Sequence, residues 1–263
     1  MGVIRALTDA GIPIDIINGT SAGAIMGGGY ALYRDVDTMA VKIRDIVQGV
    51  KLGYFNIFRH SEQGQSFMRK WLQGAVCDVA SLRTSVQSHA HNLKALRMLF
   101  DDHEFADTKI PFSCAAFDLV SRKTVVIKRG KLVDGVLASV TLPGIFPPVR
   151  RGKQLLIDGY VLANIPVREL RAEGADFVIS VELGTTERDP YSNGIELLSY
   201  VEGMKNRRLE RWEIEQSDFH IRVNFAHYDG ARFDNYVVAM ELGYEVARRM
   251  VPRLKRRLEQ RAG

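Results

Sequence analysis

Residues 12–23 read IPIDIINGTSAG, an apolar run that ends in a serine with a glycine two positions before it and another two positions after it. The run is short and β-branched, which is typical of a buried strand, and residues 22–34 return to helical spacing. Gly19, Ser21 and Gly23 therefore fit a GxSxG turn between a strand and a helix, where glycine permits a close chain crossing and the serine hydroxyl projects at the carboxyl end of the strand. The pattern predicts Ser21 as a nucleophile, while a Gly/Ser turn without chemistry stays open as the alternative.

Strand and helix patterns alternate along the rest of the chain and predict an α/β fold. We expect a three-layer α/β/α sandwich with a mainly parallel central sheet and one local hairpin at residues 117–130. No repeat or linker divides the chain, so residues 1–263 are expected to form a single domain. The predicted strands are 12–18, 110–119, 123–130, 154–158, 176–183 and 218–225, and the predicted helices are 2–11, 22–34, 37–50, 64–76, 133–140, 165–174, 194–216 and 235–251.

The composition is that of an ordinary globular protein, with 263 residues of which 46% are hydrophobic. No apolar run approaches the roughly 20 residues that span a bilayer. The net charge is +5, and residues 247–263 are strongly basic; they could meet anionic headgroups, although a solvated terminal helix explains them more simply. No nucleic-acid-binding signature accompanies these charges, so nucleic acid is not expected as a partner.

The first residues lack the features of a secretory signal, so we expect a cytoplasmic protein whose contact with a membrane, if any, is peripheral. Cys77 and Cys114 have neither metal-binding nor redox spacing and are expected to be buried free thiols. The segment from about residue 49 to residue 109 is the least regular. It is expected either to cap a site or to be an ordinary run of helices and loops.

A serine hydroxyl needs a base within hydrogen-bond reach, and the sequence offers two kinds. A Ser-Asp-His order, as in α/β-hydrolases, would favour His220 or His227, but both lie in or beside a strand pattern and read more simply as structural histidines. Asp158 ends the short strand at 154–158 and is followed by Gly159, which permits close backbone approach. Taken alone, this pair is explained better by an Asp-Gly turn.

Two blocks of sequence together resemble patatin-like phospholipases, including relatives of neuropathy target esterase. The first block is GVIRALTDAGIPIDIINGTSAGAIMGG at residues 2–28, and the second is ASVTLPGIFPPVRRGKQLLIDGYVLANIPV at residues 138–167. The likeness extends over residues 2–184. It implies an acyl hydrolase that cleaves phospholipid or lysophospholipid esters through a Ser-Asp dyad and an acyl-enzyme, with no metal and no organic cofactor. The roles carried over are the nucleophile Ser21, the base Asp158 and the motif residues Gly19, Thr20, Ala22, Gly23 and Gly159.

Members of this family carry a glycine-rich GGGxxG loop shortly before the helix that opens this chain, and the backbone N–H groups of that loop form the oxyanion hole. The sequence begins at Met1, past the position of that loop, so we expect the native protein to start upstream. Gly27, Gly28 and Gly29 do not replace the loop. They lie in the helix after Ser21 and are expected to allow close packing of helix on sheet.

Two features near Asp158 also bear on the resemblance. Tyr160 stands where the family usually has glycine or alanine, and it adds bulk beside the presumed base. The loop at residues 138–149 is expected to be a scaffold beside the site rather than a source of catalytic groups, because Pro143, Pro147 and Pro148 restrict its backbone.

The stretch KLGYFNIFRH at residues 51–60 interleaves aromatic and basic side chains. It could form a lipid-contacting lip, while packing of the aromatics in the core is the simpler explanation. In the first case acyl chains would meet Tyr54, Phe55 and Phe58, and headgroups would meet Lys51 and Arg59.

Two other functions remain open from the sequence. The chain could be a lipid-binding or scaffold protein that keeps the dyad but lacks oxyanion stabilisation, because the loss of one oxyanion donor alone lowers turnover by about two to three orders of magnitude. It could also be a Ser-His-Asp esterase of the α/β-hydrolase fold.

Overall fold

The computed structural model describes residues 1–49, 85, 87–184, 194–224 and 236–262. Several features discussed above lie outside these residues: the predicted helix at 64–76, the aromatic stretch at 51–60, Cys77, His60 and His227. The strands are β1 (Ile17–Thr20), β2 (Phe112–Asp118), β3 (Lys123–Ile127), β4 (Val149–Arg151), β5 (Gln154–Asp158), β6 (Ile179–Gly184) and β7 (Phe219–Asn224). The helices are α1 (Gly2–Asp9), α2 (Ala22–Tyr33), α3 (Val36–Gly49), α7 (Ala90–Phe100), α8 (Leu132–Ser139), α9 (Tyr160–Ala163), α10 (Val167–Ala172), α11 (Gly194–Glu215) and α12 (Tyr236–Ala262), with one 3-10 turn at Phe105–Asp107.

The described strands form two sheets. The larger has the order β1-β2-β5-β4, with β3 also pairing with β2, and β6 and β7 form the smaller. Pairing is parallel for β1 with β2 and for β6 with β7, and antiparallel for β2 with β3, β2 with β5 and β4 with β5. The expectation of a mainly parallel sheet is therefore corrected to a mixed one. The cause is the short connections, because β3 follows β2 and β5 follows β4 through tight turns that only antiparallel neighbours can use.

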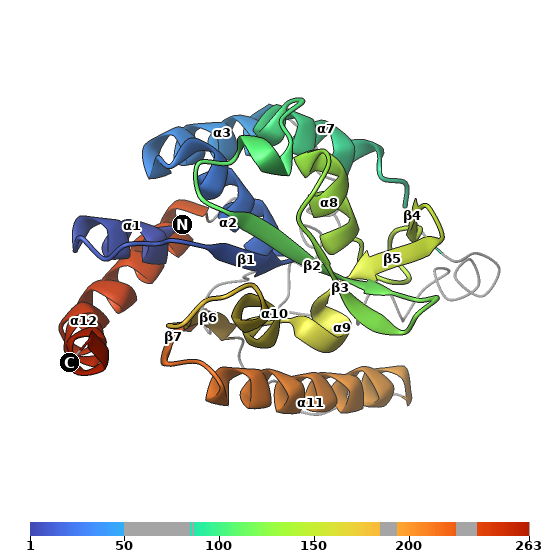
Figure 1. Ribbon diagram of the computed structural model, residues 1–263. Coiled ribbons are helices and arrows are strands. Elements are labelled where there is room, and N and C mark those ends of the chain that lie inside the picture. The colour runs from blue at the N-terminus through green and yellow to red at the C-terminus, as the bar shows by residue number, and fades with distance from the viewer. Residues whose placement is uncertain (50–84, 86, 185–193, 225–235, 263) are drawn as a thin grey trace.

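Helices cover both faces of the larger sheet (Figure 1). On one side α2 packs against β1 and β2 while α8 packs against β2, and α3 and α7 complete that layer. On the other side α10 contacts β1, α9 contacts β2, and α11 lies beneath α9. This arrangement agrees with the predicted α/β/α layering.

Gly27 and Gly28 let α2 lie directly on the sheet, as expected, whereas Gly29 allows close packing against α3 instead. An added Cβ at Gly27 would lie 2.8 Å from Ile17 Cγ2, and one at Gly28 would lie 2.8 Å from Phe112 Cε1. At Gly29 the added atom would collide with the side chain of Met39 on α3. These contacts confirm that the glycines serve close packing, as expected.

The strand that leads to the serine turn is shorter than its apolar run. Residues 12–16 form no strand, and β1 begins at Ile17, whose N–H donates to Pro111 O at 2.9 Å. Ile12 is instead part of the turn that closes α1, because its N–H donates to Leu7 O at 2.9 Å. Ile12 and Ile14 pack in one apolar cluster with side chains of α12 and β7. The hydrophobic pattern here therefore indicates burial rather than a strand.

Among the residues that the structure describes, no helix is both long enough and apolar enough to cross a bilayer. Within the same residues, Cys114 is a buried free thiol, as predicted. Burial raises the pKa of this thiol well above its ordinary value, so it stays protonated and behaves as a small apolar side chain.

Candidate active site

Ser21 occupies a sharp turn between β1 and α2. Its backbone has φ 53° and ψ −120°, a conformation that a residue with a side chain rarely adopts. Such a conformation costs on the order of 1–3 kcal/mol and persists only where the surroundings enforce it. Gly19 is part of that enforcement, because an added Cβ there would collide with the backbone of Gly23 and Ala24 as the helix turns back over the strand. The predicted chain crossing is thus present.

The other motif residues have different roles. Gly23 is exposed, and an added Cβ at Gly23 would meet no atom within 4 Å, so the crossing does not need this second glycine. Thr20 is buried, and its Oγ1 donates to Ala163 O at 2.6 Å, which ties the end of β1 to α9. Ala22 is the first residue of α2 and is half-buried.

Strand β2 brings Asp158 next to the serine turn. Thr20 pairs with Ala115 on one side of β2, and Asp158 pairs with the following residue, Ala116, on the other. Gly159 completes the approach, because an added Cβ there would lie 2.5 Å from Ala115 O and 3.0 Å from Thr20 Cγ2. Two residues separated by 137 positions therefore flank the same point of one strand.

The Asp158 carboxyl is fully buried, and its two oxygens have different environments. Oδ1 accepts a hydrogen bond of 3.0 Å from the N–H of Tyr160. Oδ2 accepts no hydrogen bond of normal geometry from any residue that the structure describes. Burial raises the pKa of Asp158 to about 7, and the Tyr160 N–H and the nearby Ser21 hydroxyl oppose that rise. The Ser21 hydroxyl therefore acts on Asp158 through a loose contact, as catalytic groups often do before substrate binds.

Ser139 was not singled out from the sequence, yet it holds the serine turn. It is fully buried at the end of α8, and its Oγ accepts the N–H of Ser21 at 3.0 Å while donating to Ala115 O at 2.7 Å. Two residues later, Thr141 O accepts the N–H of Asp158 at 2.8 Å. The loop at 138–149 is a scaffold for the site, as predicted, but polar groups at its start make the contacts rather than its prolines.

Tyr160 lies immediately beyond Asp158, as the first residue of α9. Its side chain is half-buried, and the pKa of its phenol is raised by burial and by the negative charges of Asp158 and Glu202. The phenol therefore stays neutral and available as a hydrogen-bond donor near the buried carboxyl.

Comparison with known proteins decides the family. The model of the patatin-like phospholipase family matches residues 1–171, which include the serine turn, Ser139 and Asp158. The chain belongs to the patatin-like phospholipase family. This confirms the resemblance that the two sequence blocks indicated, and with it the α/β fold class.

Several curated proteins are similar to this patatin-like chain. Lysophospholipase NTE1 of Debaryomyces hansenii is 29% identical over 195 residues, covering 74% of this chain and 11% of that protein. Patatin-like phospholipase domain-containing protein 7 of Mus musculus is 28% identical over 201 residues, covering 76% of this chain and 14% of that protein. Patatin-like phospholipase domain-containing protein 6 of Mus musculus is 28% identical over 194 residues, covering 73% and 13%. The patatin-like chain thus spans a small part of the length of these relatives.

Histidine side chains in the described part of this patatin-like chain have partners other than the two candidate residues. In the described part of the structure, no histidine hydrogen-bonds to Ser21 or Asp158. Both ring nitrogens of His220 are engaged elsewhere, Nδ1 with Ser180 Oγ at 3.0 Å and Nε2 with Glu182 Oε2 at 3.0 Å. Because both ring nitrogens already have partners, His220 is better explained as a structural histidine than as a catalytic base.

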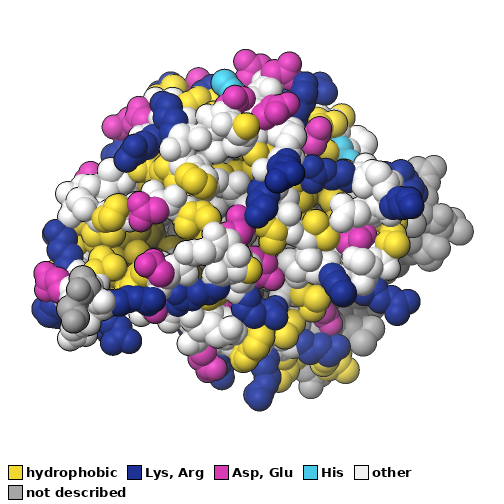
Figure 2. Space-filling view, viewed as in Figure 1, with side chains coloured by type: hydrophobic (Ala, Val, Ile, Leu, Met, Phe, Trp, Pro, Cys, Tyr) yellow, Lys and Arg dark blue, Asp and Glu magenta, His cyan; other side chains and the backbone are white. Residues whose placement is uncertain are grey.

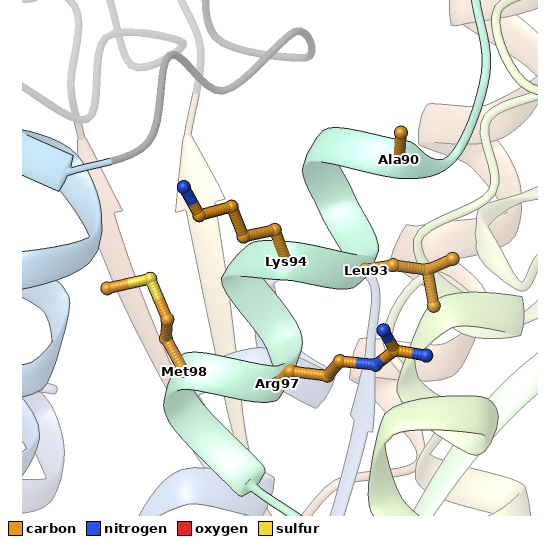
Figure 3. A pocket seen from close by; sticks show the side chains of 5 residues that line it. All are labelled: Ala90, Leu93, Lys94, Arg97 and Met98. Atoms are coloured by element: carbon orange, nitrogen blue, oxygen red, sulfur yellow. The ribbon is translucent and has the colours of Figure 1, made fainter.

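A hollow of about 510 Å³ runs along α7 of the patatin-like domain (Figure 3). Its described lining comes from that one helix, and neither Ser21 nor Asp158 contributes to it. It therefore carries no argument about the chemistry. The residues that line the hollow are Ala90, Leu93, Lys94, Arg97 and Met98.

Within the described ranges, no three His, Cys, Asp or Glu side chains gather as metal ligands.

Proposed function

We propose that this chain hydrolyses fatty-acyl esters of phospholipids or lysophospholipids, with Ser21 as nucleophile and Asp158 as base. One observation carries the proposal: β2 holds a strained serine and a buried carboxyl side by side, close enough for the Ser21 hydroxyl to affect the pKa of Asp158. The printed names of the relatives, lysophospholipase and patatin-like phospholipase, support the substrate class.

The reaction requires one proton acceptor, and Oδ2 of Asp158 is available because no described group donates to it with normal geometry. As Ser21 Oγ bonds to the ester carbonyl carbon, its proton passes to Asp158. The tetrahedral intermediate then collapses, the C–O bond to the alcohol breaks, and Asp158 returns the proton to the departing alcohol. Asp158 next takes a proton from water, whose oxygen attacks the acyl-enzyme. Release of the fatty acid gives that proton back to Ser21 Oγ.

The pKa of Asp158 suits this role. A carboxylate with an ordinary pKa is a weak base toward a hydroxyl group, and a general base works best when its pKa lies near the operating pH. Burial raises the pKa of Asp158 to about 7, which makes the carboxylate more basic while leaving a useful fraction of it ionised at neutral pH. Among the described residues, the groups that lower this pKa are the Tyr160 N–H and the Ser21 hydroxyl, and neither is a cation.

Labelling by a fluorophosphonate and release of fatty acid from lysophosphatidylcholine test the proposal together. We expect wild type to react in both assays, Ser21→Ala to react in neither, and Asp158→Asn to lose at least about two orders of magnitude, the usual contribution of a general base. His220→Ala is the control, because its side chain bonds to Ser180 and Glu182 instead. A folded wild type without Ser21-dependent labelling would contradict the proposal and favour a lipid-binding protein. Loss of labelling in the folded His220 variant would favour a Ser-His-Asp esterase.

A further inference from the structure

Helix α11 turns an apolar face toward solvent. Leu197, Val201 and Met204 follow one another at four and three positions, the spacing that places side chains on one side of a helix. Their exposed fractions are 39%, 39% and 50%. Tyr200, between them, is also exposed. A helix with this spacing normally buries these side chains, so the pattern indicates a surface made for contact.

The same face becomes basic in its second half. Arg208 and Arg211 continue the spacing of Leu197, Val201 and Met204, and both are exposed. Lys205 and Arg207 flank them, so that apolar and basic side chains gather along the lower edge of the molecule, where α11 lies (Figure 2).

The acidic side chains of the described part of α11 have partners or lie elsewhere. Glu202 pairs with Lys205 at 3.4 Å, Glu210 bonds to Asn164, and Glu213 is buried against Arg168. Glu215, at the last turn, is exposed. Apolar side chains beside exposed basic ones are the composition of helices that lie in the interface of an anionic membrane.

Helix α11 packs beside the candidate active site through the side opposite this face. Helix α9 begins directly after Asp158 and Gly159, and α11 packs on it. Asn164, which follows α9, hydrogen-bonds to Glu210 of α11, and the phenol of Tyr160 is close enough to Glu202 for that charge to raise its pKa. The exposed face therefore points away from α9, and α11 itself links it to the segment that follows Asp158.

We propose that the face of α11 formed by Leu197, Val201, Met204, Arg208 and Arg211 docks the protein onto an anionic phospholipid surface. The choice of a lipid surface as occupant rests on the proposed function, and the charge of the face supports it. The apolar side chains enter the interface, and the arginines contact lipid phosphates.

Vesicle co-sedimentation tests the docking face. The probe is an equal mixture of phosphatidylcholine and phosphatidylglycerol, and the test variant is Leu197→Ser, Val201→Ser, Met204→Ser. Its matched control is Val41→Ser, Met98→Ser, Val237→Ser, three helical side chains with exposed fractions of 46%, 37% and 49% on other parts of the chain. We expect the test variant to lose about tenfold or more in partitioning and the control to bind as wild type does.

Substitution of the two arginines provides a second test of the docking face. Arg208→Gln and Arg211→Gln are each expected to weaken binding to the anionic mixture about fivefold and to leave binding to pure phosphatidylcholine unchanged. Because the substituted side chains are exposed, unfolding midpoints should stay close to that of wild type. If the triple variant melts early, Met204→Glu alone serves, and its vesicle binding should fall likewise.

Several results would overturn the docking face. These are wild type that does not sediment with the vesicles, a test variant that binds like wild type, or a control that loses as much binding as the test variant. Sedimentation that shows a wild-type dimer and a monomeric test variant would assign the face to a second copy instead. Turnover of a water-soluble short-chain ester is measured separately: if it is absent while the vesicle results hold, the proposed function fails and the docking face stands.

Discussion

Asp158→Asn should make the folded protein more stable at neutral and alkaline pH while it removes activity. The pKa of Asp158 is about 7 in the folded protein, against the ordinary aspartate value of 3.8, so unfolding releases a proton at any pH between these two values. The folded state binds more protons than the unfolded state in this window, and the free energy of unfolding therefore falls as pH rises through it. Each pH unit removes about 1.4 kcal/mol, so wild type loses about 4 kcal/mol relative to the asparagine variant, most of it between pH 4 and pH 7.

Urea unfolding of both proteins from pH 5 to pH 8 measures this difference. We expect the stability of Asp158→Asn relative to wild type to increase by about 2–3 kcal/mol over that range and to level off above pH 7. The pH profile of kcat/KM for a soluble ester should rise with the same apparent pKa, because the proposed base is the ionised carboxyl. If the difference in free energy of unfolding between wild type and Asp158→Asn does not change between pH 5 and pH 8, burial does not raise the pKa of Asp158 and the reasoning is refuted.

Asp118→Asn is the matched control. Asp118 is also buried, but its pKa is lowered, first by the N–H of Leu155 and then by groups that include Ser121. Its contribution to stability is fully present above the ordinary carboxyl pKa and disappears only as pH falls below it. The difference between wild type and Asp118→Asn should therefore stay constant from pH 5 to pH 8. If this difference instead changed with pH as it does for Asp158→Asn, the pH dependence would be a general property of the protein and not of Asp158.

Four further substitutions test the serine turn and the structural role of His220. Gly19→Ala should destabilise the fold by about 1–3 kcal/mol or more, since its Cβ meets backbone, whereas Gly23→Ala should be neutral or stabilise α2 by up to about 1 kcal/mol; equal unfolding midpoints would contradict this. Ser139→Ala leaves the buried N–H of Ser21 without its acceptor, so urea unfolding should show a loss of about 1–3 kcal/mol and fluorophosphonate labelling should slow; unchanged stability and labelling would refute the positioning role. His220→Ala should lower the unfolding midpoint but not the labelling rate, and a selective loss of labelling would count against the structural role of His220.

The serine turn could be predicted because its chemistry is local. A strand, a GxSxG turn and a helix follow one another within about twenty residues, and the steric need at Gly19 is visible in the spacing itself. The same pattern suggested that Gly23 is equally required, and the structure shows open space there. Spacing thus locates the serine turn but does not show which glycine meets another backbone.

The rest of the site depends on contacts between distant segments. Ser139 sits in an apolar helix, and nothing in its neighbourhood marks it as the acceptor for the N–H of Ser21. The mixed sheet was missed because alternating strand and helix patterns favour parallel crossovers, while the tight turns before β3 and β5 decide the pairing. The apolar positions of α11 have the period of a buried face, but the structure turns them outward, because burial is set by what surrounds a helix.

Strand β2 explains how a strained serine and a buried carboxyl can coexist in one site. Each would be unstable alone, since the backbone of Ser21 is forced into an unfavourable region and Asp158 loses solvation. Ser21 is linked to Ala115 O through Ser139, which accepts the N–H of Ser21 and donates to that carbonyl. Gly159, next to Asp158, packs so closely against the same carbonyl that no side chain would fit there. Rotation of the turn would therefore break a buried hydrogen bond, and withdrawal of Asp158 would break its pairing with Ala116. The contacts that offset the backbone strain of Ser21 and the desolvation of Asp158 are thus the same contacts that keep the two residues together.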